Sequence, residues 1–186
     1  ERFAEDALRM LRALRFAARL SFRIDGETAA AIHAARTRLR AVAPERLHKE
    51  LSGILCGRQA AALLEEFSDV LFELIPELAP CQGFRQYNPH HTRDVWTHTL
   101  AVVDGVPPEE PLRLAALLHD AGKPATFFFD KNLVGHFYGH PAAGAAVTEE
   151  VLRRLRYDRA TAEFVTQLVA VHDRPIPDDL RGMRRM

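Results

Sequence analysis

The sequence contains few cysteines and no segment suited to a membrane. Its 186 residues include two cysteines, Cys56 and Cys81, which are too few for a disulfide framework, and neither belongs to a CxxC pair. No apolar run approaches the roughly 18 residues that span a bilayer, and the chain does not open on a secretory signal. Its 47% hydrophobic and 27% charged residues are typical of a folded, soluble protein. We therefore expect a cytoplasmic protein with reduced thiols and no membrane partner.

Net charge is also absent, because 25 basic residues balance 25 acidic ones. The two halves of the chain nevertheless carry net charges of opposite sign. Residues 1–58 carry twelve basic and seven acidic side chains, a net of +5, whereas residues 59–186 carry thirteen basic and eighteen acidic, a net of −5. This asymmetry allows a nucleotide or nucleic-acid surface on one half only, so a net charge of zero does not exclude such a partner.

Strand patterns are scarce, and helix signals follow one another along the chain. Helices are predicted over residues 4–20, 27–40, 44–56, 59–75, 94–104, 111–120, 141–157 and 160–172. Residues 81–93 are predicted to form a loop, and the pattern of residues 125–139 is compatible with one short hairpin. The predicted class is therefore all-α, a multi-helix bundle with a first unit over 1–80 and a second over 81–186.

Histidines gather in the second half, where seven of the nine lie between His90 and His172. His98, His119 and His172 fall on apolar stripes of separate predicted helices. Imidazoles and carboxylates that point into a helical core are costly unless they are paired or metal-bound, and converging helices supply the ligands that a divalent cation prefers. Taken alone, His98 or His172 is better explained as a hydrogen-bonded core residue than as a metal ligand. The candidate metal ligands are His98, His119, Asp120, His140 and His172.

The segment LLHDAGKP, with a histidine upstream, resembles the HD superfamily of metal-dependent phosphohydrolases. The resemblance makes His98 in DVWTHTL the first ligand and His119-Asp120 the pair that names the superfamily. The histidines of GHPAAGA and LVAVHD match the additional ligands of members with two metals. The distant final aspartate of the superfamily has no clear counterpart, and Asp173 is the candidate substitute.

The resemblance implies hydrolysis of phosphate esters with a divalent metal, Mg, Mn or Ni. Such a metal lowers the pKa of a bound water toward ~7, and a second metal ~3.5–4 Å away stabilises the attacking and leaving oxygens. We expect His119 and Asp120 to be catalytic and Lys123 to neutralise a phosphate, with a solvated surface lysine as the alternative. Three further histidines show no such pattern and are interpreted as loop residues: His90, His91 and His136.

The first predicted helix carries an E-D-x-x-R motif, from Glu5 to Arg9. On a helix Glu5 and Arg9 are i, i+4 neighbours, and Arg12 continues their face. A carboxylate such as Asp6 beside a guanidinium can accept from and donate to the edge of a base. From the motif alone, the alternative is an ordinary salt-bridged helix.

The surrounding segment ERFAEDALRMLRALRFAARLSFRID resembles the neck of bacterial tRNA nucleotidyltransferases (CCA-adding enzymes) and poly(A) polymerases, and APERLHKEL resembles the family's next helix. Farther on, LIPEL, HHTRDVWTHTL, LRLAALLHDAGKP and HFYGHPAAGA resemble the HD domain that many members carry. The resemblance makes residues 1–80 a helical neck and residues 81–186 an HD domain. It implies that Asp6 and Arg9 read the base of CTP or ATP, with Glu5 and Arg12 beside them. The basic helices then face the nucleotide and the 3′ end of tRNA or another RNA.

The domain that carries out nucleotidyl transfer in this family, the head, has no counterpart before Glu1. Members of the family also continue with more helices beyond the position of Met186. We therefore expect part of a longer nucleotide-adding protein that retains a phosphohydrolase for 2′,3′-cyclic or terminal phosphates. Two alternatives stay open. One is a non-catalytic nucleotide- or RNA-binding module with a structural HD core, and the other is a free-standing HD hydrolase whose basic helices only scaffold.

Overall fold

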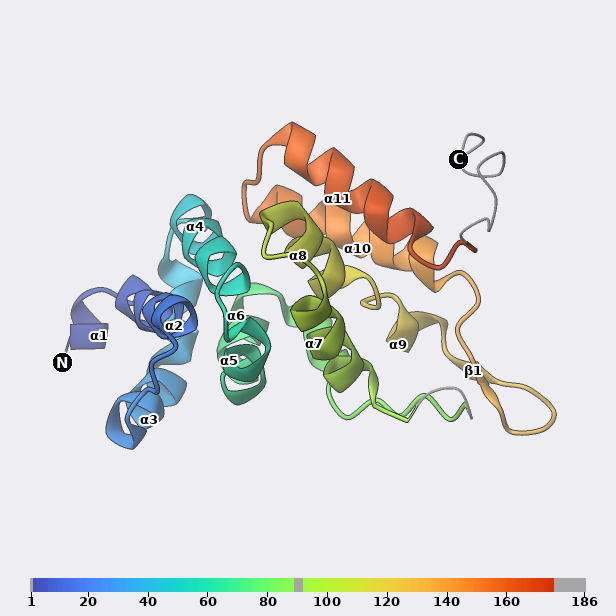
Figure 1. Ribbon diagram of the computed structural model, residues 1–186, viewed down its shortest axis with the longest axis horizontal. Coiled ribbons are helices and arrows are strands. Elements are labelled where there is room, and N and C mark those ends of the chain that lie inside the picture. The colour runs from blue at the N-terminus through green and yellow to red at the C-terminus, as the bar shows by residue number, and fades with distance from the viewer. Residues whose placement is uncertain (1, 89–91, 176–186) are drawn as a thin grey trace.

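The structure, a computed structural model, describes residues 2–88 and 92–175. The regular secondary structure in these ranges is helical except for one short hairpin (Figure 1). The first half contains α1 (Arg2–Glu5), α2 (Leu8–Leu20), α3 (Gly26–Ala35), η1 (Arg36–Ala41), α4 (Pro44–Leu55), α5 (Ala60–Glu66), α6 (Ser68–Leu74) and η2 (Pro76–Cys81), where η marks a 3-10 helix. The second half contains α7 (Val95–Gly105), α8 (Glu110–Leu118), α9 (Lys123–Thr126), β1 (Phe128–Phe129), β2 (Gly135–His136), α10 (His140–Arg154) and α11 (Arg159–Val171). The predicted all-α class is confirmed. None of the described helices is long and apolar enough to cross a bilayer.

Three helices that were predicted as continuous are divided. The helix expected over 27–40 ends as an α-helix at Ala35 and continues as the 3-10 helix η1. The other two are interrupted at single points. The helix expected over 4–20 breaks after Glu5, where the Asp6 carboxylate accepts the backbone N–H of Leu8, the first residue of α2, at 3.1 Å. The helix expected over 59–75 breaks at Phe67, whose buried ring stacks on His33 of α3 at a centroid distance of 4.8 Å. Tertiary packing and side-chain capping thus override helix propensity at both points.

The helix that carries His98 begins where the sequence predicts. Asp94 caps α7 by accepting the backbone N–H of Thr97 at 2.7 Å, and its second oxygen accepts the N–H of Gly83 at 3.1 Å. One side chain therefore fixes the start of α7 and ties it to the loop that precedes it.

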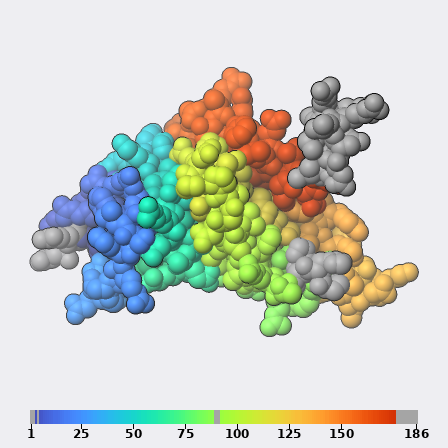
Figure 2. Space-filling view, in the orientation of Figure 1, coloured from blue at the N-terminus to red at the C-terminus, as the bar shows by residue number. Residues whose placement is uncertain are grey.

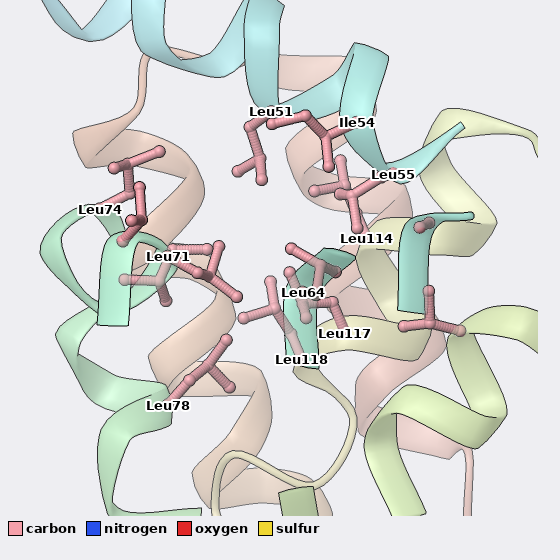
Figure 3. Packing of buried hydrophobic residues seen from close by; sticks show 14 of the residues in the cluster. Leu51, Ile54, Leu55, Leu64, Leu71, Leu74, Leu78, Leu114, Leu117 and Leu118 are labelled. Atoms are coloured by element: carbon pink, nitrogen blue, oxygen red, sulfur yellow. The ribbon is translucent and has the colours of Figure 1, made fainter. Parts of the chain in front are cut away.

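A single hydrophobic core runs from α2 to α11, so the two halves of the chain share their interior. Figure 3 shows leucines of α4, α5 and α6 with Leu114, Leu117 and Leu118 of α8, and α4 packs directly on α8. Polar contacts cross the same boundary. The Ser52 hydroxyl lies 3.0 Å from the hydroxyl of Tyr157, and Arg154 forms two short ion-pair contacts with Glu77.

The basic first half and the hairpin lie far apart. In Figure 1, α2 and β1 lie toward opposite ends of the long axis, and the colours of Figure 2 show the same separation on the surface. Surfaces on these two elements are therefore distinct sites.

Candidate functional site

Four helices bring four histidines to one buried carboxylate. His98 lies in the first turn of α7, His119 directly follows α8, His140 begins α10, and His172 directly follows α11. The carboxylate belongs to Asp120, whose side chain is 2% exposed. The structure thus brings together all five side chains predicted as metal ligands.

Three of these rings are oriented by the same local hydrogen bond. The Nδ1 atoms of His119, His140 and His172 lie 2.7–2.9 Å from the carbonyl oxygen three residues earlier in each case. A carbonyl can only accept, so Nδ1 carries the proton and Nε2 is left with a lone pair in the neutral ring. Metal-binding histidines are commonly fixed in this way by a second partner.

The Nε2 atoms converge on Asp120. Oδ2 lies 3.1 Å from Nε2 of His119 and 3.6 Å from Nε2 of His98. Oδ1 lies 3.5 Å from Nε2 of His140 and 3.7 Å from Nε2 of His172. The ligand atoms form two triads that share Asp120, one with His98 and His119 and one with His140 and His172, and within each triad they lie within 4.8 Å of one another.

Electrostatics keep this carboxylate ionised. Burial opposes ionisation of Asp120, but the close contacts with His119 and His172 and the positive charge of Lys123 outweigh it, so the pKa of Asp120 lies well below its usual range. Burial lowers the pKa of His140, which favours the neutral ring that a metal needs, whereas for His172 the contact with Asp120 outweighs burial and raises the pKa. Among the described residues, Oδ2 of Asp120 is a buried oxygen with no hydrogen bond of good geometry. A buried carboxylate oxygen of this kind, beside imidazole nitrogens, fits a divalent cation.

Lys123 is buried in the same cluster. Its Nζ lies 2.8 Å from Oδ2 of Asp120 and donates to Oε1 of Gln86 at 2.9 Å, and its side chain is 6% exposed. The alternative of a solvated surface lysine is therefore wrong. The ammonium group instead places a fixed positive charge at the wall of the histidine pocket.

The cluster opens into a pocket of about 300 Å³. Its lining includes the five candidate ligands, Lys123 and Asp173, the candidate for the final aspartate. It also includes Asn88, His136 and Tyr138, which the sequence did not single out. His136 had been interpreted as a loop residue, but it belongs to β2 and lines the pocket; His90 and His91 lie outside the described residues. No local sequence pattern predicts that these residues line the pocket, because it is the tertiary fold that brings the hairpin next to the ligand histidines.

The arginine helix forms ion pairs of its own. Arg9 donates to Glu5 at 2.9 Å across one helical turn, as the motif predicts, and Asp6 lies 3.3 Å from Arg46 of α4. Glu5 of α1 and Arg9 of α2 are therefore paired, and Asp6, which lies between the two helices, is tied to α4 by Arg46.

Farther along α2, Arg12 and Arg15 converge on Glu50, a buried residue of α4, at 3.3 and 2.6 Å. These side chains line a groove of about 630 Å³ between α2 and α4. Four arginines and one lysine face a single glutamate along its wall: Arg12, Arg15, Arg19, Arg46, Lys49 and Glu50. The groove is strongly cationic, although the whole chain is neutral.

Comparison with known proteins assigns the histidine pocket and the cationic groove to two different families. The family described as HD domain matches residues 90–185. The chain belongs to the HD domain family. A second family, described as probable RNA and SrmB-binding site of polymerase A, matches residues 21–81. The histidine cluster thus lies in the HD match, and α4, one wall of the cationic groove, lies in the other.

Several curated proteins resemble this HD domain protein along almost its full length. The CC-adding tRNA nucleotidyltransferase of Thermus thermophilus is 38% identical over 200 residues, which cover 100% of this chain and 45% of the relative. The A-adding tRNA nucleotidyltransferase of Deinococcus radiodurans is 35% identical, with 97% and 44% covered. The multifunctional CCA protein of Ralstonia nicotianae is 36% identical, with 92% and 42% covered. The predicted resemblance to tRNA nucleotidyltransferases is confirmed, and the chain spans somewhat less than half of these relatives.

Proposed function

We propose that the HD half is a divalent-metal phosphohydrolase centre acting on 2′,3′-cyclic or terminal phosphates. The observation that carries the proposal is the pair of ligand triads that share the ionised carboxylate of Asp120. A bridging carboxylate with histidines on both sides suits one or two cations of the Mg, Mn or Ni type. Bound there, a divalent cation supplies Lewis acidity and an acidified water.

The other side chains of the pocket have two roles, metal binding and charge compensation. His98, His119, His140 and His172 present their Nε2 atoms as ligands, and the carbonyl-bound Nδ1 atoms hold three of these rings in place. Lys123 balances the charge of Asp120 in the apo protein. In the metal-loaded protein, the ammonium group of Lys123 would be available to a phosphate oxygen of the substrate.

Metal content and turnover test this proposal. The purified protein with Mn²⁺, Ni²⁺ or Mg²⁺ should hydrolyse bis-p-nitrophenyl phosphate or adenosine 2′,3′-cyclic phosphate, and His119→Ala should lower the rate at least about 100-fold. His33→Ala is the matched control, because His33 lies on α3 and pairs with Asp69, away from the cluster. A protein that binds no metal and turns over neither ester would instead support a structural HD core.

We further propose that residues 1–80 are the neck and residues 81–186 the HD unit of a protein that adds nucleotides to the 3′ end of tRNA or a similar RNA. The cationic groove, the polymerase A match and the names of the relatives support this role. In that protein Asp6 and Arg9, beside Glu5 and Arg12, would read CTP or ATP. These four residues lie within one short stretch of the chain, from the end of α1 to the first half of α2.

RNA binding by the neck tests the second proposal. Binding of a tRNA to the chain should weaken steeply with salt, and Arg9→Ala or Arg12→Ala should reduce both the affinity and the salt slope. Arg159→Ala, which removes an exposed arginine of α11, should leave binding unchanged. Salt-independent binding, or an equal loss with the control, would contradict the role of the neck.

A further inference from the structure

The hairpin displays aromatic side chains on its outer surface. Phe128 is 41% exposed and Tyr138 is 74% exposed, whereas most large aromatic residues of a folded domain are largely buried. His136 lies between them in sequence and is partly buried. An exposed cluster of this kind costs free energy in isolation and commonly marks a binding surface.

Strand register places these three rings on one face. Phe128 pairs with His136 across the hairpin, and Tyr138 follows two residues later, so all three side chains point the same way. The ring of His136 stacks on Phe128 at 5.5 Å and on Tyr138 at 5.2 Å, with interplanar angles of 29° and 27°. We name Phe128, His136 and Tyr138 the aromatic platform.

The opposite face of the hairpin is packed and anchored. Phe127 lies edge-on to Phe84 at 5.3 Å, and the backbone N–H of Gly135 donates to the carbonyl of Tyr87 at 2.8 Å. Asp130 closes the turn by accepting the N–H groups of Asn132 and Val134.

Asp130 also fixes the platform itself, because its second carboxylate oxygen lies 3.2 Å from Nε2 of His136. The hairpin, although short, therefore holds the platform in one orientation.

The platform borders the histidine pocket. His136 and Tyr138 line that pocket together with Asp120, Lys123 and the four ligand histidines. A molecule with a phosphate group at Lys123 and the ligands therefore has flat aromatic rings beside it at the mouth. Aromatic faces stack on nucleobases of any sequence.

We propose that the aromatic platform is a base-stacking subsite that makes the HD centre selective for nucleoside phosphates and unpaired RNA ends over phosphate esters without a base. This inference rests on the proposed function, since it assumes that the histidine pocket holds the phosphate. Tyr138 is the principal stacking residue because it is the most exposed member and lines the pocket. Phe128 and His136 support its ring from behind.

Equilibrium binding tests the platform without relying on turnover. Isothermal titration of the full chain in Mg²⁺ compares adenosine 3′-monophosphate with ribose 5-phosphate, which has the phosphate but no base. We expect tighter binding of the adenosine nucleotide. Tyr138→Ala should weaken that binding about tenfold, the equivalent of about 1.4 kcal/mol, and leave ribose 5-phosphate unaffected, whereas Tyr138→Phe should retain the preference. Phe164→Ala removes another exposed aromatic residue, on α11, and should change neither affinity.

The outcomes separate the platform from the phosphohydrolase. Equal affinity of the wild type for the two ligands, binding of neither, or an equal loss of both in Tyr138→Ala overturns the platform. A Tyr138-dependent preference in a protein that hydrolyses no phosphate ester supports the platform and contradicts the phosphohydrolase. Hydrolysis by a protein whose affinities and rate do not change in Tyr138→Ala supports the phosphohydrolase and contradicts the platform.

Discussion

At the scale of single residues, the charge of Asp120 organises the histidine pocket. Its carboxylate is buried, lies within ion-pair distance of Lys123 and faces four imidazole rings. Breaking a buried ion pair leaves one charge without compensation, which is more costly than never having formed the pair.

Asp120→Asn should therefore destabilise the metal-free protein through Lys123. The substitution keeps the size of the side chain but removes its charge, so the buried ammonium group loses its partner. We expect the free energy of unfolding to fall by about 3 kcal/mol, measured by urea denaturation in EDTA. Adding Lys123→Met to this variant should recover most of the loss but no metal binding. A double variant as unstable as the single one would contradict the pairing.

The sequence predicts the ligands better than it predicts their neighbours. The candidate ligands stand on apolar stripes or at helix ends, so local periodicity identifies them. The burial of Lys123 depends on Gln86, which is 37 positions away, and His136 reaches the pocket only because the hairpin folds back. Contacts of this range leave no periodic signal in the sequence.

At the scale of elements, the pocket requires a close approach between the loop after Asp120 and the start of α10. Gly122 makes this approach possible. A Cβ atom at Gly122 would collide with the backbone oxygen of His140 and the backbone nitrogen of Gly144. Because His140 begins α10, any separation here moves one ligand triad away from the other.

Gly122→Ala should therefore loosen the pocket. We expect a loss of about 2 kcal/mol in the free energy of unfolding, as is typical of overpacking, and a metal affinity at least about tenfold weaker. Calorimetry with Mn²⁺ and urea denaturation measure the two effects. Gly105→Ala is the matched control, since a Cβ atom there meets nothing within 4 Å. Equal effects of the two substitutions would argue against the close approach.

The positions of the helices were largely predictable, but their continuity was not. Caps and prolines such as Asp94 and Pro44 mark helix starts in the sequence, and the structure confirms both. The breaks at Asp6 and Phe67 arise from a capping side chain and from a ring that stacks on α3, respectively. Helix propensity contains no information about either contact.

At the scale of the whole molecule, the shared core predicts that the two halves unfold together. Leu55 of α4 is fully buried in the region where α4 packs on α8. Leu55→Ala should lower the free energy of unfolding by about 3 kcal/mol and should lower hydrogen-exchange protection in α8 as well as in α4. Loss of protection confined to α4 would show that the halves are independent.

The ion pair between Glu77 and Arg154 should make the junction between the halves sensitive to pH. Burial raises the pKa of Glu77, but the hydrogen bonds from Arg154 more than offset this, so the pKa lies below its ordinary value of 4.5. A lowered folded-state pKa contributes stability that is complete above the unfolded pKa and is lost as the pH falls through the folded value.

Glu77→Gln should therefore cost about 1 kcal/mol at pH 7, and this cost should vanish when the pH falls well below 4.5. Denaturation curves at a series of pH values measure it. Glu150→Gln breaks an exposed pair within α10 and should leave the stability unchanged. A cost for Glu77→Gln that does not depend on pH would show that the carboxylate charge is irrelevant.

The most direct test of the metal centre is anomalous diffraction from crystals grown with Mn²⁺. We expect one or two anomalous peaks among His98, His119, Asp120, His140 and His172, and none of them in Asp120→Ala. Wild-type crystals with no peak in this cluster, and with the Lys123–Asp120 ion pair intact at saturating Mn²⁺, would contradict this expectation.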